Sequence, residues 1–229
     1  GMQFIKGAII NGSGTLDISG DMGMAVQVAA GNLVMDSASI ISNVHNNVDA
    51  SAASSAAIWV GEGDITTNNS DITVNYTANK ECNSVYAKGN VTINGGNVNI
   101  AGTNASGLVS GGTAAFNDGI ITLKSDLGKT LEAGDVTFGD KIKSKVVSAN
   151  IDGSNAVDYG SITDYKYFRA SSEKLTDWLS FSAETKSVRY CSNNGVFTFA
   201  VNETGYDGTI TYSSSNEKLA TVDNTGQVT

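Results

Sequence analysis

Carboxylates are the residues of this sequence that could act as a catalytic acid and base. Hydrolysis of a glycosidic bond needs two of them on opposite sides of one cleft. Asp64 and Asp71 lie in one repeat of the chain, but the equivalent positions of the neighbouring repeats are mostly Asn, Gly or Ser. The sequence therefore predicts no paired acid and base.

Basic residues are the second possible source of catalysis, because elimination from an acidic polysaccharide needs a strong base, usually Arg or Lys. No arginine occurs between Gly1 and Phe168. Lys80 and Lys88 fall in predicted turns and Lys124 in a regular repeat, so we interpret all three as solvated side chains. The single histidine, His45, falls in a predicted protruding loop with no predictable carboxylate or nucleophile beside it.

Cofactor and metal motifs are missing from the sequence. There is no G-x-S-x-G elbow, no phosphate-binding glycine loop and no Cys/His cluster, so we expect no cofactor and no structural zinc. Calcium in the acidic turns is conceivable, but no D-x-D-x-D-G loop supports it. Pairing of Cys82 with Cys191 stays open, since it requires the C-terminal half to fold back beside the fourth repeat.

Aromatic residues give a positive signal for binding. Counting back from recurring glycines places Trp59 in a column with Gln27, Val85, Leu108 and Thr130. The adjacent column is uniformly apolar, so strand alternation predicts that it points inward and that Trp59 lies on the outer face. The members of this predicted inward column are Val28, Val60, Tyr86, Val109 and Leu131.

An outer Trp59 is suited to stacking on the apolar face of a sugar, with Asp64 and Asp71 as candidates for binding hydroxyl groups. Tyr76, in a predicted turn, is a weaker candidate of the same kind. The alternative is that the same outer stripe, extended by its aliphatic residues, packs against a loop or a domain.

Glycines define the repeat that must position these residues. Each closes one strand-like run and opens the next, and the units are too short to bury an apolar face alone. Residues within each unit alternate at period two and are interrupted by Asn, Asp, Ser and Gly, which indicates three short strands per unit. A β-propeller has longer blades of four strands, so we predict a right-handed parallel β-helix of about six coils over residues 1–148. The recurring glycines are Gly7, Gly31, Gly63, Gly89, Gly112 and Gly134.

Two polar columns support the same register, and we interpret both as structural ladders and turns. The first follows each glycine directly, and the second lies four residues further on. The widest gap between glycines contains the run SNVHNNVDASAASSA, which predicts a loop protruding from the second coil. The columns hold Asn32, Asp64, Asn90 and Asp135, and Asp36, Asn68, Asn94 and Asn117.

The C-terminal part has a different pattern. Residues 149–173 are predicted as an irregular cap or linker, and residues 174–229 contain alternating strands typical of a small antiparallel sandwich. The run ITYSSSNEKLATVDNTGQVT at residues 210–229 resembles the signature of the bacterial Ig-like group 2 domain. The resemblance implies an all-β Ig-like module of surface or secreted proteins, incomplete because the chain stops before the last strands.

The repeat region has a looser resemblance. Its run VYAKGNVTINGGNVNIAG at residues 85–102 is similar to repeats of carbohydrate-binding surface β-helix proteins. Together the two resemblances imply a non-catalytic bacterial adhesin or carbohydrate-binding protein, extracellular or on the cell surface, whose partner is a polysaccharide or a host glycan. A polysaccharide-degrading lyase or hydrolase and a structural stalk remain as alternatives.

The composition and net charge of the chain exclude some classes of binding partner. The chain has 229 residues, a formal net charge of −9 and no apolar run long enough to span a membrane. An acidic protein without clustered Lys and Arg is unsuited to nucleic-acid backbones and anionic membranes. We therefore expect no binding to nucleic acid and no insertion into a membrane. We also expect the protein to be a monomer.

Overall fold

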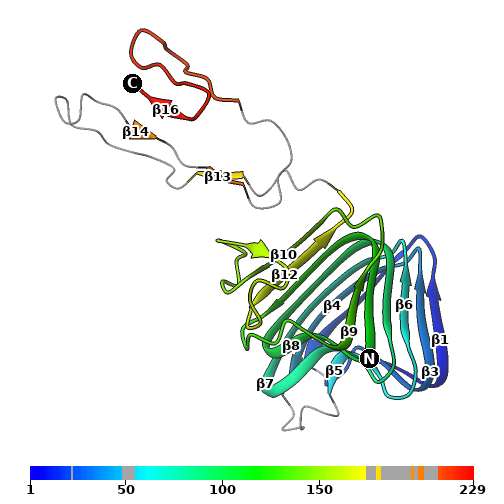
Figure 1. Cartoon of the computed structure of the whole chain (residues 1–229). Coiled ribbons are helices and arrows are strands. Elements are labelled where there is room, and N and C mark those ends of the chain that lie inside the picture. Colours follow the sequence, from blue (N-terminus) through cyan, green and yellow to red (C-terminus); the bar gives the residue numbers. More distant parts are fainter. Residues whose placement is uncertain (22, 48–54, 174–178, 182–196, 199–200, 204–210) are drawn as a thin grey trace. The chain divides into compact units, whose positions relative to one another are not determined.

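The computed structural model describes residues 1–21, 23–47, 55–173, 179–181, 197–198, 201–203 and 211–229. The chain divides into two compact units, Gly1–Glu173 and Lys174–Thr229. The first unit is an all-β parallel solenoid of about five turns, in which the strands of successive coils lie side by side (Figure 1). The predicted parallel β-helix is therefore confirmed. No helix in the described part of the chain is long and apolar enough to cross a membrane.

The strands of the solenoid follow one another around three faces. Long strands turn the corners without interruption, which is why β7 and β8 contribute to more than one face. The strands are β1 (Met2–Asn11), β2 (Thr15–Asp21), β3 (Val26–Asp36), β4 (Ser39–Asn46), β5 (Ala56–Val60), β6 (Ile65–Asn68), β7 (Asp71–Ala87), β8 (Val91–Ser125) and β9 (Leu131–Phe138).

We name the faces by the order in which each coil forms them. Parallel pairing joins the segments of each face, and their inward side chains form one continuous hydrophobic core. Face 1 contains residues 26–28, 58–60, 85–87, 108–110 and 131–133. Face 2 contains residues 33–36, 65–68, 91–94, 114–116 and 136–138. Face 3 contains residues 15–21, 39–46, 71–78, 98–103 and 120–124.

The recurring glycines stack on one another at the corner between faces 1 and 2, as the sequence predicts. A Cβ atom on Gly63 would lie 2.3 Å from the carbonyl oxygen of Gly31, and one on Gly89 would lie 2.7 Å from that of Gly63. Gly31 also has a positive φ of 83°, a conformation in which other residues are strained. Close approach of successive backbones therefore explains why glycine recurs at this corner.

The predicted polar columns are ladders of hydrogen bonds between coils. Asn117 Nδ2 donates to Asn94 Oδ1 at 2.8 Å, and Asn94 Nδ2 donates to Asn68 Oδ1 at 3.0 Å. In the other column the backbone amide of Asp64 donates to Asn32 Oδ1 at 3.0 Å. Every one of these bonds runs from a later coil to an earlier one, so the ladders share one direction.

A third ladder was not predicted. On face 3, Asn75 Nδ2 donates to Asn43 Oδ1 at 2.8 Å, Asn43 Nδ2 donates to Ser19 Oγ at 3.3 Å, and Ser19 Oγ donates to Asp17 Oδ1 at 2.6 Å. This ladder has the same direction and ends on a carboxylate of the first coil. A carboxylate is the favourable end for a row of donors, because a charged acceptor makes the stronger hydrogen bond.

The first coil departs from the predicted register. Ala8 pairs with Leu33 and is 8% exposed, whereas Ile9 pairs with Val34 and is 72% exposed. In the sequence, Ile9 and Leu33 each follow a recurring glycine, Gly7 and Gly31, by two residues, which predicts that they pair; this prediction is wrong by one residue. A register shift between Lys6 and Ala8 is the cause.

Strand β4 continues further than predicted. His45 lies on it, paired between Asp21 and Thr77, where the sequence placed a protruding loop. Strand pairing thus extends to Asn46, beyond which residues 48–54 of the predicted loop lie outside the described residues. Of the polar residues that suggested a loop, Asn43 and His45 are exposed outward positions of a strand, whereas Ser42 and Asn46 are buried inward positions.

The last coil stops after two faces, so the solenoid has about five complete turns where six were predicted. On face 3 the strand after β8 is β12 (Tyr167–Ser171), which pairs antiparallel, followed by β10 (Ser144–Ser148) and β11 (Val157–Asp158). Residues 149–173 are thus not wholly irregular, because they contribute two strands to the sheet.

An aromatic cluster closes this C-terminal end of the core. Phe168 is fully buried, with its ring centroid 5.3 Å from that of Phe116, 6.4 Å from that of Phe138 and 5.7 Å from that of Tyr159. Tyr165 packs edge-on against Tyr159 at 6.5 Å. The core therefore ends under a lid of large side chains.

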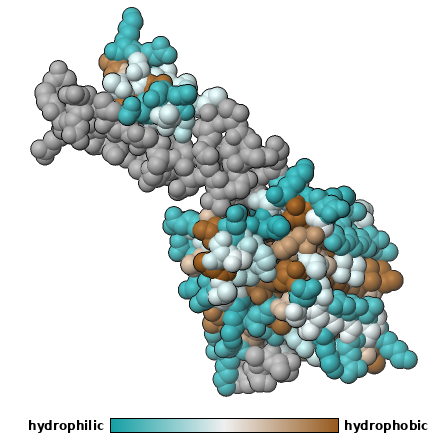
Figure 2. All heavy atoms as spheres, viewed as in Figure 1, coloured by the Kyte–Doolittle hydropathy of each residue, from teal (hydrophilic) through white to brown (hydrophobic). Residues whose placement is uncertain are grey.

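The opposite end of the stack carries no comparable cover in the described part of the chain. Inward residues of the first coil, such as Phe4 and Ile10, are only partly buried, while outward Ile5 is 78% exposed. Figure 2 shows hydrophobic spheres at the surface along the side of the solenoid that β1 forms. The two ends of the stack are therefore built differently.

The second unit shows antiparallel pairing in its described residues. β13 (Leu179–Phe181) pairs with β15 (Val201–Glu203), and β14 (Phe197–Thr198) pairs with β16 (Gln227–Val228). Asp223 Oδ1 accepts hydrogen bonds from the amides of Thr225 and Gln227, which closes a turn before β16. The antiparallel character agrees with the prediction, but no Ig-like sandwich is established. Cys191 lies outside the described residues.

Candidate functional site

The outer surface of face 1 carries a stripe of five side chains, one from each coil from the second onward. Pairing places Gln27 beside Trp59, Trp59 beside Tyr86, and Val109 beside Glu132. Tyr86 in turn pairs with Val109. We name this row the face 1 stripe. Its first four members are partly exposed, as expected of outward side chains inside a sheet, and Glu132 is exposed.

The predicted membership of this stripe was partly wrong. Val85 and Leu108 were expected beside Trp59 on the outside, but they are 3% and 1% exposed and line the core with Ile58. Tyr86 was expected to point inward and lies on the outer surface beside Trp59. The outward position of Trp59 itself agrees with the prediction.

A difference in corner length causes this error. Residues 61–64 connect face 1 to face 2 in the third coil, whereas residues 88–90, one fewer, make the same connection in the fourth. Counting back four residues from the glycine therefore slips by one residue in the fourth and fifth coils, and by two in the last coil, where Glu132 takes the place predicted for Thr130. Aligning the apolar pairs on each side of the corner separately would have placed Tyr86 beside Trp59.

Trp59 and Tyr86 form a stacked aromatic pair. Their ring centroids are 6.4 Å apart and their planes differ by 17°. The far end of the indole ring fills the space above Gly61, where a Cβ would lie 2.1 Å from the ring. Trp59 Nε1 is buried and has no hydrogen-bond partner among the described residues. The absence of a side chain at Gly61 is thus what allows the indole to lie along the strand.

Polar groups border the aromatic pair. Glu132 Oε1 accepts a hydrogen bond of 2.8 Å from Ser106 Oγ, at one end of the stripe. Lys88 Nζ, at the corner beside Tyr86, lies 3.6 Å from Glu62 Oε1 and is paired with that carboxylate. The stripe therefore offers an apolar centre between a carboxylate end and the amide of Gln27.

Tyr76, the second aromatic candidate, is not available to a ligand. It lies on β7, not in a turn, and is 1% exposed. Its hydroxyl lies 2.8 Å from Ser55 Oγ and donates to the carbonyl oxygen of Gly23 at 3.1 Å. Asn46 Nδ2 donates to the same serine hydroxyl at 2.9 Å. Tyr76 therefore belongs to a buried polar network of the core.

Cys82 lies next to this network and is fully buried. Asn46 Nδ2 lies 3.8 Å from its sulfur. Burial raises the pKa of the Cys82 thiol above its ordinary value, which keeps the sulfur protonated and unreactive at neutral pH. We find no feature that would make it a nucleophile.

The two candidate carboxylates serve the ladders. Asp64 Oδ1 accepts from the amide of Asn90 at 2.7 Å, and Asp71 Oδ1 accepts from the amide of Asn97 at 3.1 Å and from its side-chain Nδ2 at 3.0 Å. Each carboxylate thus bonds to the coil above it, at a different corner of the solenoid. This arrangement gives both a structural role.

The basic candidates are dispersed. Lys80 is exposed at the end of face 3, Lys124 Nζ lies 5.7 Å from the ring centroid of Tyr167, and His45 Nδ1 lies 3.5 Å from Asp21 Oδ1. Within the described residues, no group of three or more His, Cys, Asp or Glu side chains could hold a metal ion.

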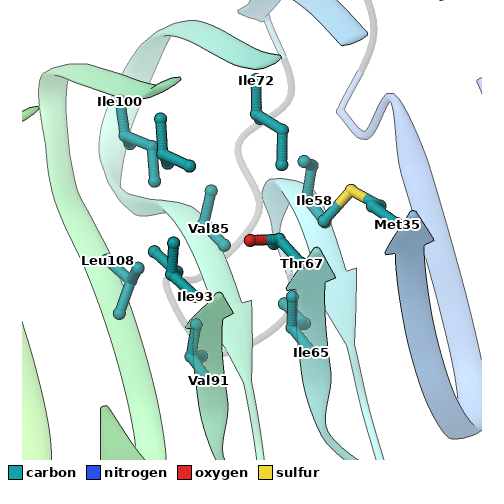
Figure 3. A pocket seen from close by; sticks show the side chains of 11 residues that line it. Met35, Ile58, Ile65, Thr67, Ile72, Val85, Val91, Ile93, Ile100 and Leu108 are labelled. Atoms are coloured by element: carbon teal, nitrogen blue, oxygen red, sulfur yellow. The ribbon is translucent and has the colours of Figure 1, made fainter. Parts of the chain in front are cut away.

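The interior of the solenoid contains a small void of about 20 Å³. Figure 3 shows the aliphatic side chains that surround it and the hydroxyl of Thr67 directed toward it. Thr67 Oγ1 is buried without a hydrogen-bond partner among the described residues. The void has room for about one water molecule, which needs at least two polar partners, so we expect it to be dry. It is a packing defect and not a ligand site.

Comparison of the chain with protein-family models, with curated proteins and with solved structures finds no match. The interpretation of the site therefore depends on its geometry.

Proposed function

We propose that this protein is a non-catalytic carbohydrate-binding or adhesion protein, acting outside the bacterial cell or on its surface as a monomer, and that the face 1 stripe contacts the glycan. The observation that carries the proposal is the stacked pair of Trp59 and Tyr86 on the outer surface. Aromatic rings on a flat sheet match the apolar faces of sugar rings, while bordering polar groups bind hydroxyls. The Ig-like group 2 resemblance of the C-terminal run is consistent with a surface or secreted protein.

The experiment is a glycan array with the intact protein and matched variants. Trp59→Ala and Tyr86→Ala should each lower binding of any recognised glycan by at least about tenfold, because each removes a stacking contact of about 1.5 kcal/mol. Thr92→Ala, an outward position on face 2, is the control and should bind as the wild type does.

Trp59→Phe separates stacking from folding. Phenylalanine keeps an aromatic face and removes the buried indole N–H, so the variant should fold at least as well as the wild type and retain part of the binding. Glycan binding that persists unchanged in both alanine variants would refute the proposal. Release of reducing ends or unsaturated products from a bound polysaccharide would instead favour an enzyme.

A further inference from the structure

We infer that the face 1 stripe recognises a neutral glycan chain that lies along the axis of the solenoid, across the strands. The inference rests on the proposed function and adds the class of ligand and its direction. It depends on the length of the stripe, on the order of its side chains and on the charges around it.

The length of the stripe favours a chain of sugars over a single one. Adjacent strands of a sheet lie about 4.8 Å apart, so Gln27 and Glu132, four coils apart, are separated by about 19 Å. The aromatic pair occupies two adjacent coils of this distance, and Val109 occupies the next. Apolar contact therefore continues over three coils, with a hydrogen-bonding side chain at each end.

The direction follows from what surrounds the aromatic pair on each strand. β5 is only 5 residues long, and the far end of the Trp59 ring already lies over Gly61 at the corner. On the other side, the residue preceding Ile58 is Ala57, which is fully buried. A ligand lying parallel to β5 would contact the ring of Trp59 alone, because the aromatic surface ends on both sides of it along the strand. A ligand lying across the strands would contact each side chain of the stripe in turn.

The charges favour a neutral ligand. The stripe contains one carboxylate and no cation. Lys88 at the adjacent corner is paired with Glu62. Lys129, within electrostatic range of Glu132, is paired with Glu81. Recognition of a uronate or sulfate normally uses Arg or Lys aligned with the anion. The chain as a whole carries a net charge of −9, which repels an acidic polymer. Glu132 uses one oxygen for Ser106, so its second oxygen is left to accept from a sugar hydroxyl.

The test uses two series of probes, neutral β-linked glucose oligomers and oligogalacturonates, each as the disaccharide, the tetrasaccharide and the hexasaccharide. Affinity is measured by calorimetry at low and high salt. Neutral oligomers should gain about tenfold in affinity from disaccharide to tetrasaccharide and little beyond, with weak dependence on salt.

End variants report the direction of the chain. Gln27→Ala and Glu132→Gln should weaken tetrasaccharide binding several-fold and leave the disaccharide unchanged, because only the longer ligand reaches the ends of the stripe. Trp59→Ala should weaken both. Thr92→Ala on face 2 is the matched control.

Two results would overturn the inference and leave the proposed function intact: tighter, salt-sensitive binding of oligogalacturonates that Trp59→Ala abolishes, or a gain with length that neither end variant alters. A different result, in which no probe of either series binds in a Trp59-dependent way, would refute this inference for these glycans. Glycan-array binding that is also unaffected by Trp59→Ala would refute the proposed function itself.

Discussion

The two ends of the solenoid differ in how they cover the hydrophobic core. At the C-terminal end, antiparallel strands replace the third face of the last coil, and five aromatic rings cover the core. At the N-terminal end, the first coil presents partly exposed inward side chains such as Phe4 and a register shift at Gly7. Since stacked coils stabilise one another through their interfaces, a coil with one covered side contributes less than a coil with two. The C-terminal end should therefore hold more of the folding free energy.

The largest expected effect is removal of the ring at the centre of the covered end. Phe168→Ala should cost about 3–5 kcal/mol, because it deletes a fully buried aromatic side chain and leaves a cavity. Phe4→Ala at the open end should cost less than about half of that, since its ring is only partly buried. Urea denaturation of the two variants measures the difference. Equal losses would show that the ends are energetically equivalent.

The second largest effect is expected at alkaline pH, which should destabilise the covered end more than the open end. Burial raises the pKa of both Tyr159 and Tyr165 above the ordinary value of 10, with a smaller contribution from nearby charge. Their contribution to stability is complete below pH 10 and is lost as the pH rises toward their folded-state pKa values, because the unfolded chain releases these protons first.

The first coil contains no tyrosine, so the loss caused by Tyr159 and Tyr165 comes from the covered end and has no counterpart at the open end. We expect the urea midpoint to fall above pH 10. The double variant Tyr159→Phe with Tyr165→Phe should show a shallower fall, with the remainder due to Tyr76 and Cys82 in the middle of the stack, whose pKa values burial also raises. A fall as steep as that of the wild type would assign the effect elsewhere.

The middle of the stack should gain stability from a single substitution. Thr67→Val keeps the shape of the side chain and removes a buried hydroxyl that has no partner among the described residues, so it should stabilise by about 1 kcal/mol. Thr66→Val, on the outer surface, is the control and should change the free energy of unfolding by less than about 0.5 kcal/mol. A loss of stability in Thr67→Val would indicate that the hydroxyl does have a partner.

The smallest effect is expected at the open end. Ile9→Lys should change the free energy of unfolding by no more than about 0.5 kcal/mol, because this side chain is 72% exposed. Ala8→Lys, at the buried neighbouring position, should unfold the first coil. Circular dichroism during thermal denaturation compares them. The reverse ranking would restore the register predicted from the sequence.

Much of the fold could be predicted from the sequence, because one physical constraint repeats in every coil. Gly63 and Gly89 recur where successive backbones approach too closely for a Cβ, and Asn94 and Asn117 recur where stacked amides bond. Both patterns survive insertions elsewhere in the coil. The register shift in the first coil and the antiparallel strands at the C-terminal end occur only once each, so they give no periodic signal in the sequence.

The site was harder to predict, because it depends on strand parity. Trp59 was placed on the outside correctly, yet its partner Tyr86 was placed inside, since a corner shortened by one residue inverts the assignment of inward and outward positions. Tyr76 illustrates a different difficulty. A tyrosine followed by polar residues suggests a turn, but its hydroxyl group contacts Ser55 and Gly23, which lie 21 and 53 residues away in the sequence.

The common direction of the hydrogen bonds in the three ladders affects how coils can be added to such a protein. A residue in the middle of a ladder, such as Asn94, accepts a hydrogen bond from the following coil and donates one to the preceding coil. Each such residue therefore supplies the acceptor and the donor that its two neighbours require. Duplicating a whole circuit in the same sense would preserve every rung, whereas an inverted circuit would set donor against donor. Gene duplication can therefore lengthen the molecule by whole circuits, and only the two terminal rungs need specialised chemistry.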